Sequence, residues 1–309
     1  MALNVNEINA RVRSDAREFI AECEADYHAK VARVARAIAD GIKTRRVVLL
    51  SGPSGSGKTT SALKLRLALE QLGVGSKQIS MDDYFLTVDL ATAPRNAEGE
   101  VDFESPLCLD LPLLNKHIKT LAEGGEIAMP RFDFPTQRRA DDLRPLRLLD
   151  NEVVIVEGIH ALGDSVSSGA SEFATRLYVS ARSNFEQDDE TVFRGTWTRL
   201  CRRVIRDAKF RNTDAHTTMS WWYNIRLGEK KYISPFKSRA DHIINSTHPY
   251  EIGVLAGFLQ TAFDGIPETV RRREELLLLS ENLACFDLIE ESLVPENSLL
   301  REFIGNANF

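Results

Sequence analysis

The sequence predicts an α/β protein in which a mostly parallel sheet lies between two layers of helices, with helical extensions at both ends of the chain. Residues 46–50 form a short apolar run that leads into a glycine-rich turn and then into a helical stretch from Lys58 to about Leu72. This succession is how a β-α-β unit begins. Further runs with the composition of buried strands follow, at residues 77–81, 152–156, 176–180 and 242–245. Helical segments separate most of them, which favours a parallel sheet covered on both faces.

Both ends of the chain have the pattern of amphipathic helices. In the first forty residues apolar side chains recur every three or four positions between charged ones, and Gly41 is a suitable stop signal. Residues 250–309 are similar, with Gly305 as the expected C-cap. We therefore expect a helical extension over residues 1–44, a core over 45–250, and a helical segment over 251–309 that packs on the core. Residues 1–44 either cover an edge of the core or form a contact in a homo-oligomer, and the sequence leaves both interpretations open.

Composition and charge exclude several classes of protein. Of 309 residues, 43% are hydrophobic and 27% charged, and the formal net charge is −6. An acidic balance argues against a protein that binds nucleic acid by neutralising phosphates. No apolar run reaches the roughly 18 residues of a membrane span, and no secretory signal precedes the first helix. The four cysteines form no CxxC pair, as expected of reduced thiols. We expect a cytoplasmic protein whose partner is a small molecule, with no nucleic acid and no membrane.

The glycine-rich turn after the first strand is the strongest chemical signal. It satisfies the pattern G-x-x-x-x-G-K-[ST] in full and lies between a strand and a helix, as this motif requires. Glycines let backbone N–H groups turn inward around phosphate oxygens, and the helix N-terminus adds its positive dipole end. Lys58 supplies a charge to the β- and γ-phosphates, and the Thr59 hydroxyl can bind Mg²⁺. We therefore expect ATP to bind to Gly52, Pro53, Ser54, Gly55, Ser56, Gly57, Lys58, Thr59 and Thr60.

Acidic residues follow two of the other expected strands. Asp82 and Asp83 come directly after residues 78–81, and Glu157 ends the apolar run 153–156. Ligands of open α/β sheets bind at the carboxyl ends of strands. Phosphoryl transfer needs a metal carboxylate and a group that orients or deprotonates the acceptor. These acids are the candidates for both tasks, and helix caps or solvated loop residues are the alternative interpretation.

Two further segments stand out. Residues 124–149 are rich in Pro, Arg and Asp and are expected to form a hairpin that departs from the sheet. Arg203 and Arg206 lie three positions apart and share a helix face, where guanidinium groups suit the charge of a transferring phosphoryl group. The aromatic run 221–223 is expected to be core packing.

Several motifs occur together and in order: GPSGSGKTT at 52–60, SMDDYF at 80–85, VDFESP at 101–106, PRFDF at 130–134, VVIVEGIHAL at 153–162, RLCRRVIRDAKFRN at 199–212, GEKKYISPF at 228–236 and SLLREFIG at 298–305. The chain thereby resembles the uridine kinase and phosphoribulokinase family of P-loop kinases, and most closely the bacterial uridine kinase-like nucleoside kinases. The resemblance implies a P-loop NTPase three-layer sandwich.

The resemblance also implies roles for individual residues. Asp82 matches the acid that accepts the proton of the acceptor hydroxyl. Thr59 and Glu157 match magnesium positions, to which Asp82 is added as a candidate. Residues 199–215 match an arginine-rich lid, in which Arg206 and Arg211 close over the phosphates beside Lys58.

For the acceptor, the resemblance implies that Glu104 pairs with ribose hydroxyls, that Arg203 contacts the substrate, and that Phe132 lines the base pocket, in preference to Phe134. Gln137 is placed to bond a base edge. Relatives often carry Tyr and His where this chain has Phe132 and Gln137, and many have Asp in place of Glu104. The acceptor class therefore stays open.

Three functions are compatible with these residues. The first is an ATP- and Mg²⁺-dependent nucleoside kinase that phosphorylates a ribose 5′-hydroxyl. The second is a kinase of the same family that acts on a sugar phosphate or another small alcohol, as phosphoribulokinase or pantothenate kinase does. This second function stays possible because Arg131, Arg138 and Arg139 lie close to Phe132 in the sequence and could bind an anionic acceptor. The third is a non-catalytic regulatory protein, which the presence of Asp82 and Glu157 disfavours. A GTPase is disfavoured because no N-K-x-D signature is present.

Overall fold

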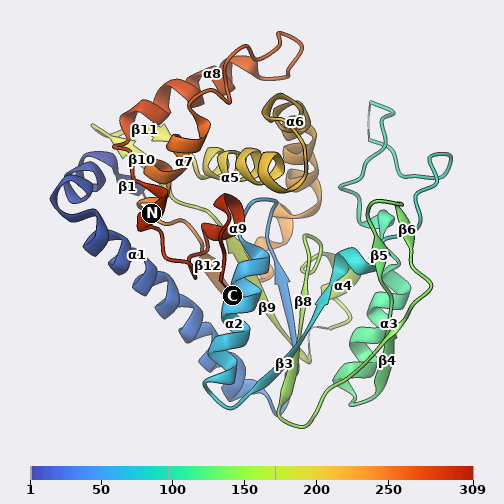
Figure 1. The fold of residues 1–309 in the computed structure, drawn as a ribbon. Helices are drawn as coiled ribbons and strands as arrows, with labels where there is room; N and C mark the ends of the chain where they lie inside the picture. The colour runs from blue at the N-terminus through green and yellow to red at the C-terminus, as the bar shows by residue number, and fades with distance from the viewer. Residues whose placement is uncertain (1, 97, 171, 309) are drawn as a thin grey trace.

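Five parallel strands form the central sheet, in the order β12-β9-β2-β8-β3. The computed structural model describes residues 2–96, 98–170 and 172–308, and Figure 1 shows its fold. The strands are β2 (Val47–Ser51), β3 (Gly75–Ser80), β8 (Glu152–Glu157), β9 (Ala174–Ser180) and β12 (His242–Asn245). Each lies within a few residues of an apolar run identified in the sequence. The predicted fold class, an α/β sandwich with a parallel sheet, is confirmed.

Helices cover both faces of this sheet. Alternate residues of β2 enter two different cores: Val48 and Leu50 pack on one face, and Val47 and Leu49 on the other. The first core is completed by helices α1 (Val5–Gly41), α2 (Lys58–Glu70), α5 (Gly195–Phe210) and α7 (Glu251–Leu259). The second is completed by α3 (Leu111–Ala122) and α4 (Asp164–Ser167). A strand buried on both faces reads as a continuous apolar run because neither face meets water.

The N-terminal extension is one long helix that packs on α2 (Figure 1). Asn4 caps it by accepting a hydrogen bond from the Glu7 N–H at 3.0 Å, and it ends at Gly41, where the stop signal was predicted. Non-helical backbone interrupts it at Asp15, at φ −157° and ψ 96°. A small sheet that the sequence does not signal joins this end to the body, formed by β1 (Ala2–Asn4), β10 (Asn184–Gln187) and β11 (Glu190–Phe193).

Short antiparallel strands occupy the segment expected to form a hairpin. β4 (Glu126–Met129) pairs with β7 (Arg144–Arg147), and β5 (Phe132–Asp133) pairs with β6 (Arg138–Arg139). With α3 they form a part of the molecule, here called the hairpin lobe, that stands to one side of the sheet in Figure 1.

The C-terminal segment is less helical than predicted. The segment follows α6 (Ala215–Tyr232) and β12, and its described residues form α7, α8 (Arg273–Asn282), the single turn α9 (Arg301–Ile304) and short 3-10 turns. Gly265 and Pro295 fall in the irregular stretches, and both residue types interrupt helices. The segment nevertheless buries Leu299, Leu300 and Phe303 completely. Within the described residues, no helix is both long enough and apolar enough to cross a membrane.

Candidate active site

The topology brings the three expected nucleotide and metal elements to one edge of the sheet. β2, β8 and β3 are neighbours and run parallel, so that Leu50 and Ser80 both lie beside Glu157. The glycine-rich loop follows β2, Glu157 ends β8, and Asp82 follows β3. Because the carboxyl ends of these strands coincide, residues from three distant parts of the chain form one site.

The loop between β2 and α2 has the shape of a phosphate cradle. A side chain at Gly52 would lie 2.0 Å from the Val179 carbonyl oxygen, so that only glycine fits there. Gly57 precedes α2 in a left-handed conformation at φ 80°, which glycine adopts freely. Helix α2 begins at Lys58, and its first N–H groups face the loop. The Lys58 ammonium donates to the Pro53 carbonyl oxygen at 3.3 Å and thus spans the loop.

Two buried arginines of α5 hold the outer side of this loop. Arg199 donates to the Ser54 carbonyl oxygen at 3.1 Å and Arg202 to that of Gly55 at 3.2 Å. Each is paired with a buried carboxylate, Arg199 with Glu229 at 2.8 Å and Arg202 with Glu251 at 2.7 Å. The carbonyl groups of Ser54 and Gly55 are therefore satisfied by these arginines, which fix the path of the loop. Neither Arg199 nor Arg202 was among the predicted site residues.

Burial and opposite charges govern the protonation of the site. Desolvation lowers the pKa of Lys58, against the attraction of Glu157 and Asp82. Desolvation likewise raises the pKa of Glu157 and of Asp82, although Lys58 opposes it in both. Glu157 is buried at 8% exposure and Asp82 is exposed, and both carboxylates gain from a cation beside them. The electrostatics of the site therefore favour binding of a cation.

The two adjacent aspartates have different surroundings. Asp83 pairs with Arg144 of the hairpin lobe at 2.9 Å and accepts a hydrogen bond from the Phe132 N–H at 3.4 Å. It thereby ties the hairpin lobe to the sheet. Asp82 interacts electrostatically with Lys58 and Arg211 instead. Of the pair, Asp82 is the one whose carboxylate interacts with Lys58 of the nucleotide loop.

Three of the predicted arginines gather around one buried carboxylate, Asp207. Arg206 contacts it at 2.8 Å, Arg203 at 3.2 Å and Arg211 at 3.6 Å. Arg203 also donates to the Ser54 hydroxyl at 2.7 Å, so that the cluster reaches the nucleotide loop. Three positive charges on one carboxylate leave a surplus suited to phosphate.

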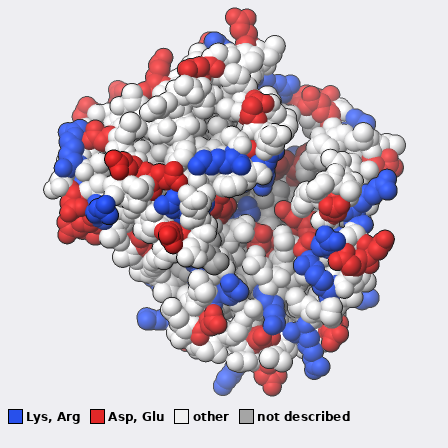
Figure 2. Space-filling model, viewed as in Figure 1, with Lys and Arg blue, Asp and Glu red and all other residues white. Residues whose placement is uncertain are grey.

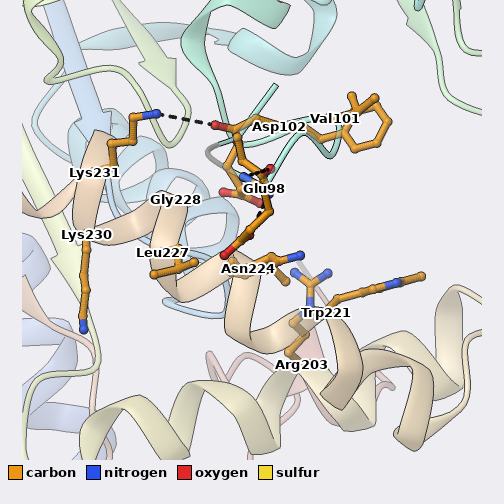
Figure 3. A pocket seen from close by; sticks show the side chains of 14 residues that line it. Glu98, Val101, Asp102, Arg203, Trp221, Asn224, Leu227, Gly228, Lys230 and Lys231 are labelled. Carbon is orange, nitrogen blue, oxygen red and sulfur yellow. Dashed lines mark hydrogen bonds and ion pairs between the residues drawn. The ribbon is translucent and has the colours of Figure 1, made fainter. Parts of the chain in front are cut away.

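A cavity of about 740 Å³ opens next to Arg203 and contains Glu104; we call it the Glu104 cavity (Figure 3). Burial raises the pKa of Glu104 to about 7, against the attraction of Arg203 and Lys58. One wall is helix α6, where Gly228 leaves room: a side chain there would lie 2.4 Å from Glu104 Cβ. Figure 2 shows positive and negative side chains around a hollow between the hairpin lobe and the rest of the protein.

Trp221 corrects one prediction. The aromatic run 221–223 was expected in the core, yet only Trp222 is buried, at 9% exposure. Trp221 is 47% exposed and lines the Glu104 cavity with Asn224. Residues 221, 224, 225 and 228 fall on one face of α6, since side chains three and four apart are neighbours on a helix.

The structure does not bring Phe132 and Gln137 into the Glu104 cavity, whose described lining includes neither. Phe132 is 8% exposed and packs on Phe85, with ring centroids 5.5 Å apart. Gln137 lies in the turn between β5 and β6, at φ 54°. Phe134 is 56% exposed, so Phe132 is the buried member of the alternating pair.

One residue at the loop lies within the SLLREFIG motif at 298–305, although no role was predicted for it. Glu302, from α9, accepts hydrogen bonds from the Thr60 N–H at 3.2 Å and the Thr60 hydroxyl at 2.6 Å. Beside it, Leu299 lies against Gly57. A carboxylate therefore sits at the helix N-terminus where a phosphate is expected. No local signal could reveal this, because the partners are 242 positions apart.

The donors at this edge fit Mg²⁺. Thr59, Glu157 and Asp82 offer hard oxygens, and Mg²⁺ is commonly held by one or two carboxylates, substrate phosphates and water. Among the described residues, no group of three or more His, Cys, Asp or Glu side chains could hold a metal by itself. A metal here would therefore depend on phosphate ligands.

Comparison with known proteins agrees with this geometry. The model of the phosphoribulokinase/uridine kinase family matches residues 47–252, more than half of the chain. The uridine kinase of Deinococcus deserti is 28% identical over 200 residues, covering 64% of this chain and 86% of that protein. The uridine kinase of Staphylococcus aureus (strain JH9) is 27% identical over 207 residues, covering 66% of this chain and 88% of that protein. A proposed fructose transport system kinase from Silicibacter sp. TM1040 shares the fold at TM-score 0.51 and 18% identity, over 69% of this chain and 98% of that one. The chain belongs to the phosphoribulokinase/uridine kinase family, and its family places it among the phosphotransferases.

Proposed function

We propose that the protein is an ATP-dependent nucleoside kinase, similar to uridine and cytidine kinases, that transfers the γ-phosphate of ATP to a ribose 5′-hydroxyl. One observation carries the proposal: Asp82 follows β3 at the sheet edge and interacts electrostatically with Lys58 of the phosphate loop and with Arg211, while its neighbour Asp83 is bound to Arg144. A free carboxylate at this place is suited to orient the acceptor hydroxyl and take its proton. The curated relatives named uridine kinase support the acceptor class.

The remaining residues have complementary tasks in this proposal. Lys58 and the arginines Arg206 and Arg211 offset the charge of the transferring phosphoryl group. Mg²⁺, held by Thr59, Glu157 and Asp82 together with the phosphates, would supply charge neutralisation. Glu104 accepts hydrogen bonds from ribose hydroxyls, and positioning of this kind accounts for a large part of the rate.

The walls of the Glu104 cavity favour a nucleoside with a flat, uncharged base. Val101, Phe103, Trp221, Ile225 and Leu227 form most of the apolar lining, and an exposed indole is a suitable stacking surface. Lys231 is engaged by Asp102 at 3.9 Å (Figure 3). A sugar phosphate remains the second candidate for the acceptor, because two cations, Lys230 and Arg203, line the same cavity.

The test is ADP release with ATP and Mg²⁺ against a panel of acceptors. The panel contains uridine, cytidine, adenosine, guanosine, thymidine, ribulose 5-phosphate and pantothenate. We expect turnover with a nucleoside, and a loss in kcat of about 100- to 10,000-fold in Asp82→Asn. Asp83→Asn is the matched control: the same change one position away is expected to alter kcat only a few-fold, because Asp83 faces Arg144.

Other outcomes separate the proposals. Turnover only with ribulose 5-phosphate or pantothenate would reject the nucleoside and retain the kinase. Equal losses in Asp82→Asn and Asp83→Asn would contradict the role given to Asp82. ATP binding without turnover on any acceptor would favour the non-catalytic regulatory protein.

A further inference from the structure

A second cavity, of about 530 Å³, lies on a different face of helix α6 from the Glu104 cavity. Its walls come from the beginning of α5, the middle of α6 and the beginning of α8. We call it the Trp197 cavity. Volumes of this size are typical of sites for small molecules, and the proposed kinase reaction does not use it.

Cationic side chains outnumber carboxylates in the lining of this cavity, although four of the cations are in ion pairs. Five cationic side chains line it, against the single carboxylate of Glu275: Arg194, Arg226, Lys230, Arg271 and Arg272. This is a local excess of positive charge in a chain whose net charge is −6. Glu275 accepts from the Trp197 indole N–H at 2.9 Å and pairs with Arg272 at 3.0 Å and with Arg194 at 3.8 Å, while Arg226 pairs with Glu229 outside the lining. Lys230 has no carboxylate partner in the described part of the chain.

The cavity also has an apolar floor. Trp197, Leu200, Met219, Trp222 and Leu276 are all at most 9% exposed. The arginines stand above aromatic rings at its rim: Arg194 over Trp197 at 5.3 Å, and Arg271 over Tyr223 at 4.9 Å. A guanidinium group that lies over an aromatic ring still has N–H donors that can bind phosphate oxygens in pairs.

We propose that the Trp197 cavity is a second ligand site, which binds a nucleotide with its ring on the apolar floor and its phosphates on the arginine rim. An aromatic and apolar floor beneath several cations fits a planar ring that carries phosphates. Inorganic phosphate would leave most of the volume empty.

The site is connected to the Glu104 cavity. Leu227 and Lys230 line both cavities. Arg271 also pairs, at 3.7 Å, with Glu98, which lines the Glu104 cavity. Phosphates at the rim compete with Glu98 for Arg271, so that a nucleotide here loosens a contact of the acceptor side.

The test is equilibrium dialysis of the whole protein with ATP and, separately, with UTP. We expect two nucleotides per wild-type chain with at least one of them. Lys58→Ala, which lacks the phosphate-loop charge, is expected to retain one. Arg194→Gln/Arg272→Gln is expected to weaken the second site about tenfold or more, because two charge-assisted contacts are lost. Arg33→Gln/Arg36→Gln, the same charge change on the exposed face of α1, is the control and should still bind two.

A second variant tests the same site in case Arg194→Gln/Arg272→Gln fails to fold. Thr196→Trp fills the Trp197 cavity without changing its charge and should also bind one nucleotide. The expectation of two nucleotides per wild-type chain rests on the proposed function, because it includes ATP at the phosphate loop. The one nucleotide expected to remain in Lys58→Ala does not depend on the proposed function. One nucleotide in the wild type and none in Lys58→Ala, with both probes, would overturn the inference. If the wild type and Lys58→Ala each bind one nucleotide, and Thr196→Trp binds none, the result would instead overturn the phosphate-loop site and support the second site.

Discussion

Replacing Glu104 by glutamine should make the protein more stable above neutral pH while weakening acceptor binding. Burial raises the pKa of Glu104 from its ordinary 4.5 to about 7. Between these values the folded chain binds more protons than the unfolded chain, so stability falls as pH rises through this window. Each unit of pKa difference is worth about 1.4 kcal/mol. The carboxylate therefore costs about 3 kcal/mol at pH 8, and about 1 kcal/mol at pH 5.

Glutamine keeps the size of the side chain and removes the titration. We expect Glu104→Gln to exceed the wild type in unfolding free energy by about 3 kcal/mol at pH 8, and the gap to narrow by roughly 2 kcal/mol at pH 5. Urea denaturation of both proteins at the two pH values measures it. Glu70→Gln, at the exposed end of α2, should show no such dependence. A gap that is the same at both pH values would refute the desolvation of Glu104.

Three other predictions follow from the site. The KM for the acceptor should fall as pH rises from about 6 to 8 in the wild type but not in Glu104→Gln, because the carboxylate, which we propose binds the acceptor hydroxyls, forms across a pKa of about 7. Arg202→Met should cost about 3–5 kcal/mol in urea denaturation, since it leaves Glu251 buried without its partner; a loss below 1 kcal/mol would contradict this. Glu302→Gln should tighten ATP binding about tenfold or more in a fluorescence titration, because it removes a negative charge from the Thr60 N–H and hydroxyl. Weaker binding would mean that Glu302 supports the loop instead.

The strands and the phosphate loop could be predicted because their signals are local. β2 and β8 are buried on both faces, so their residues form unbroken apolar runs. The loop needs glycine at fixed positions, such as Gly52 against Val179. Because β2, β8 and β3 are parallel neighbours, their carboxyl ends lie at one edge of the sheet. The loop, Glu157 and Asp82, which follow these ends, therefore lie at the same edge.

What could not be predicted depends on contacts between distant segments. Nothing near Trp221 indicates that the 98–104 stretch faces it across a cavity. An aromatic run on a helix has the same pattern whether it meets the core or a ligand site. The short β1 is also invisible in the sequence, since three residues acquire a strand conformation only by pairing with β10.

The segments outside the family match are part of the active-site framework. The match ends at residue 252 and begins at residue 47, yet both flanking parts contact the phosphate loop or the helix behind it. Tyr27 of α1 bonds to Ser61 of α2 at 2.7 Å, and Glu302 bonds to Thr60. A buried carboxylate joins the two flanks: Glu24 of α1 accepts from Ser298 at 2.5 Å. Both flanks therefore contact the first turn of α2, beside the loop where the phosphates are expected to bind, and we expect a change in either flank to affect nucleotide binding.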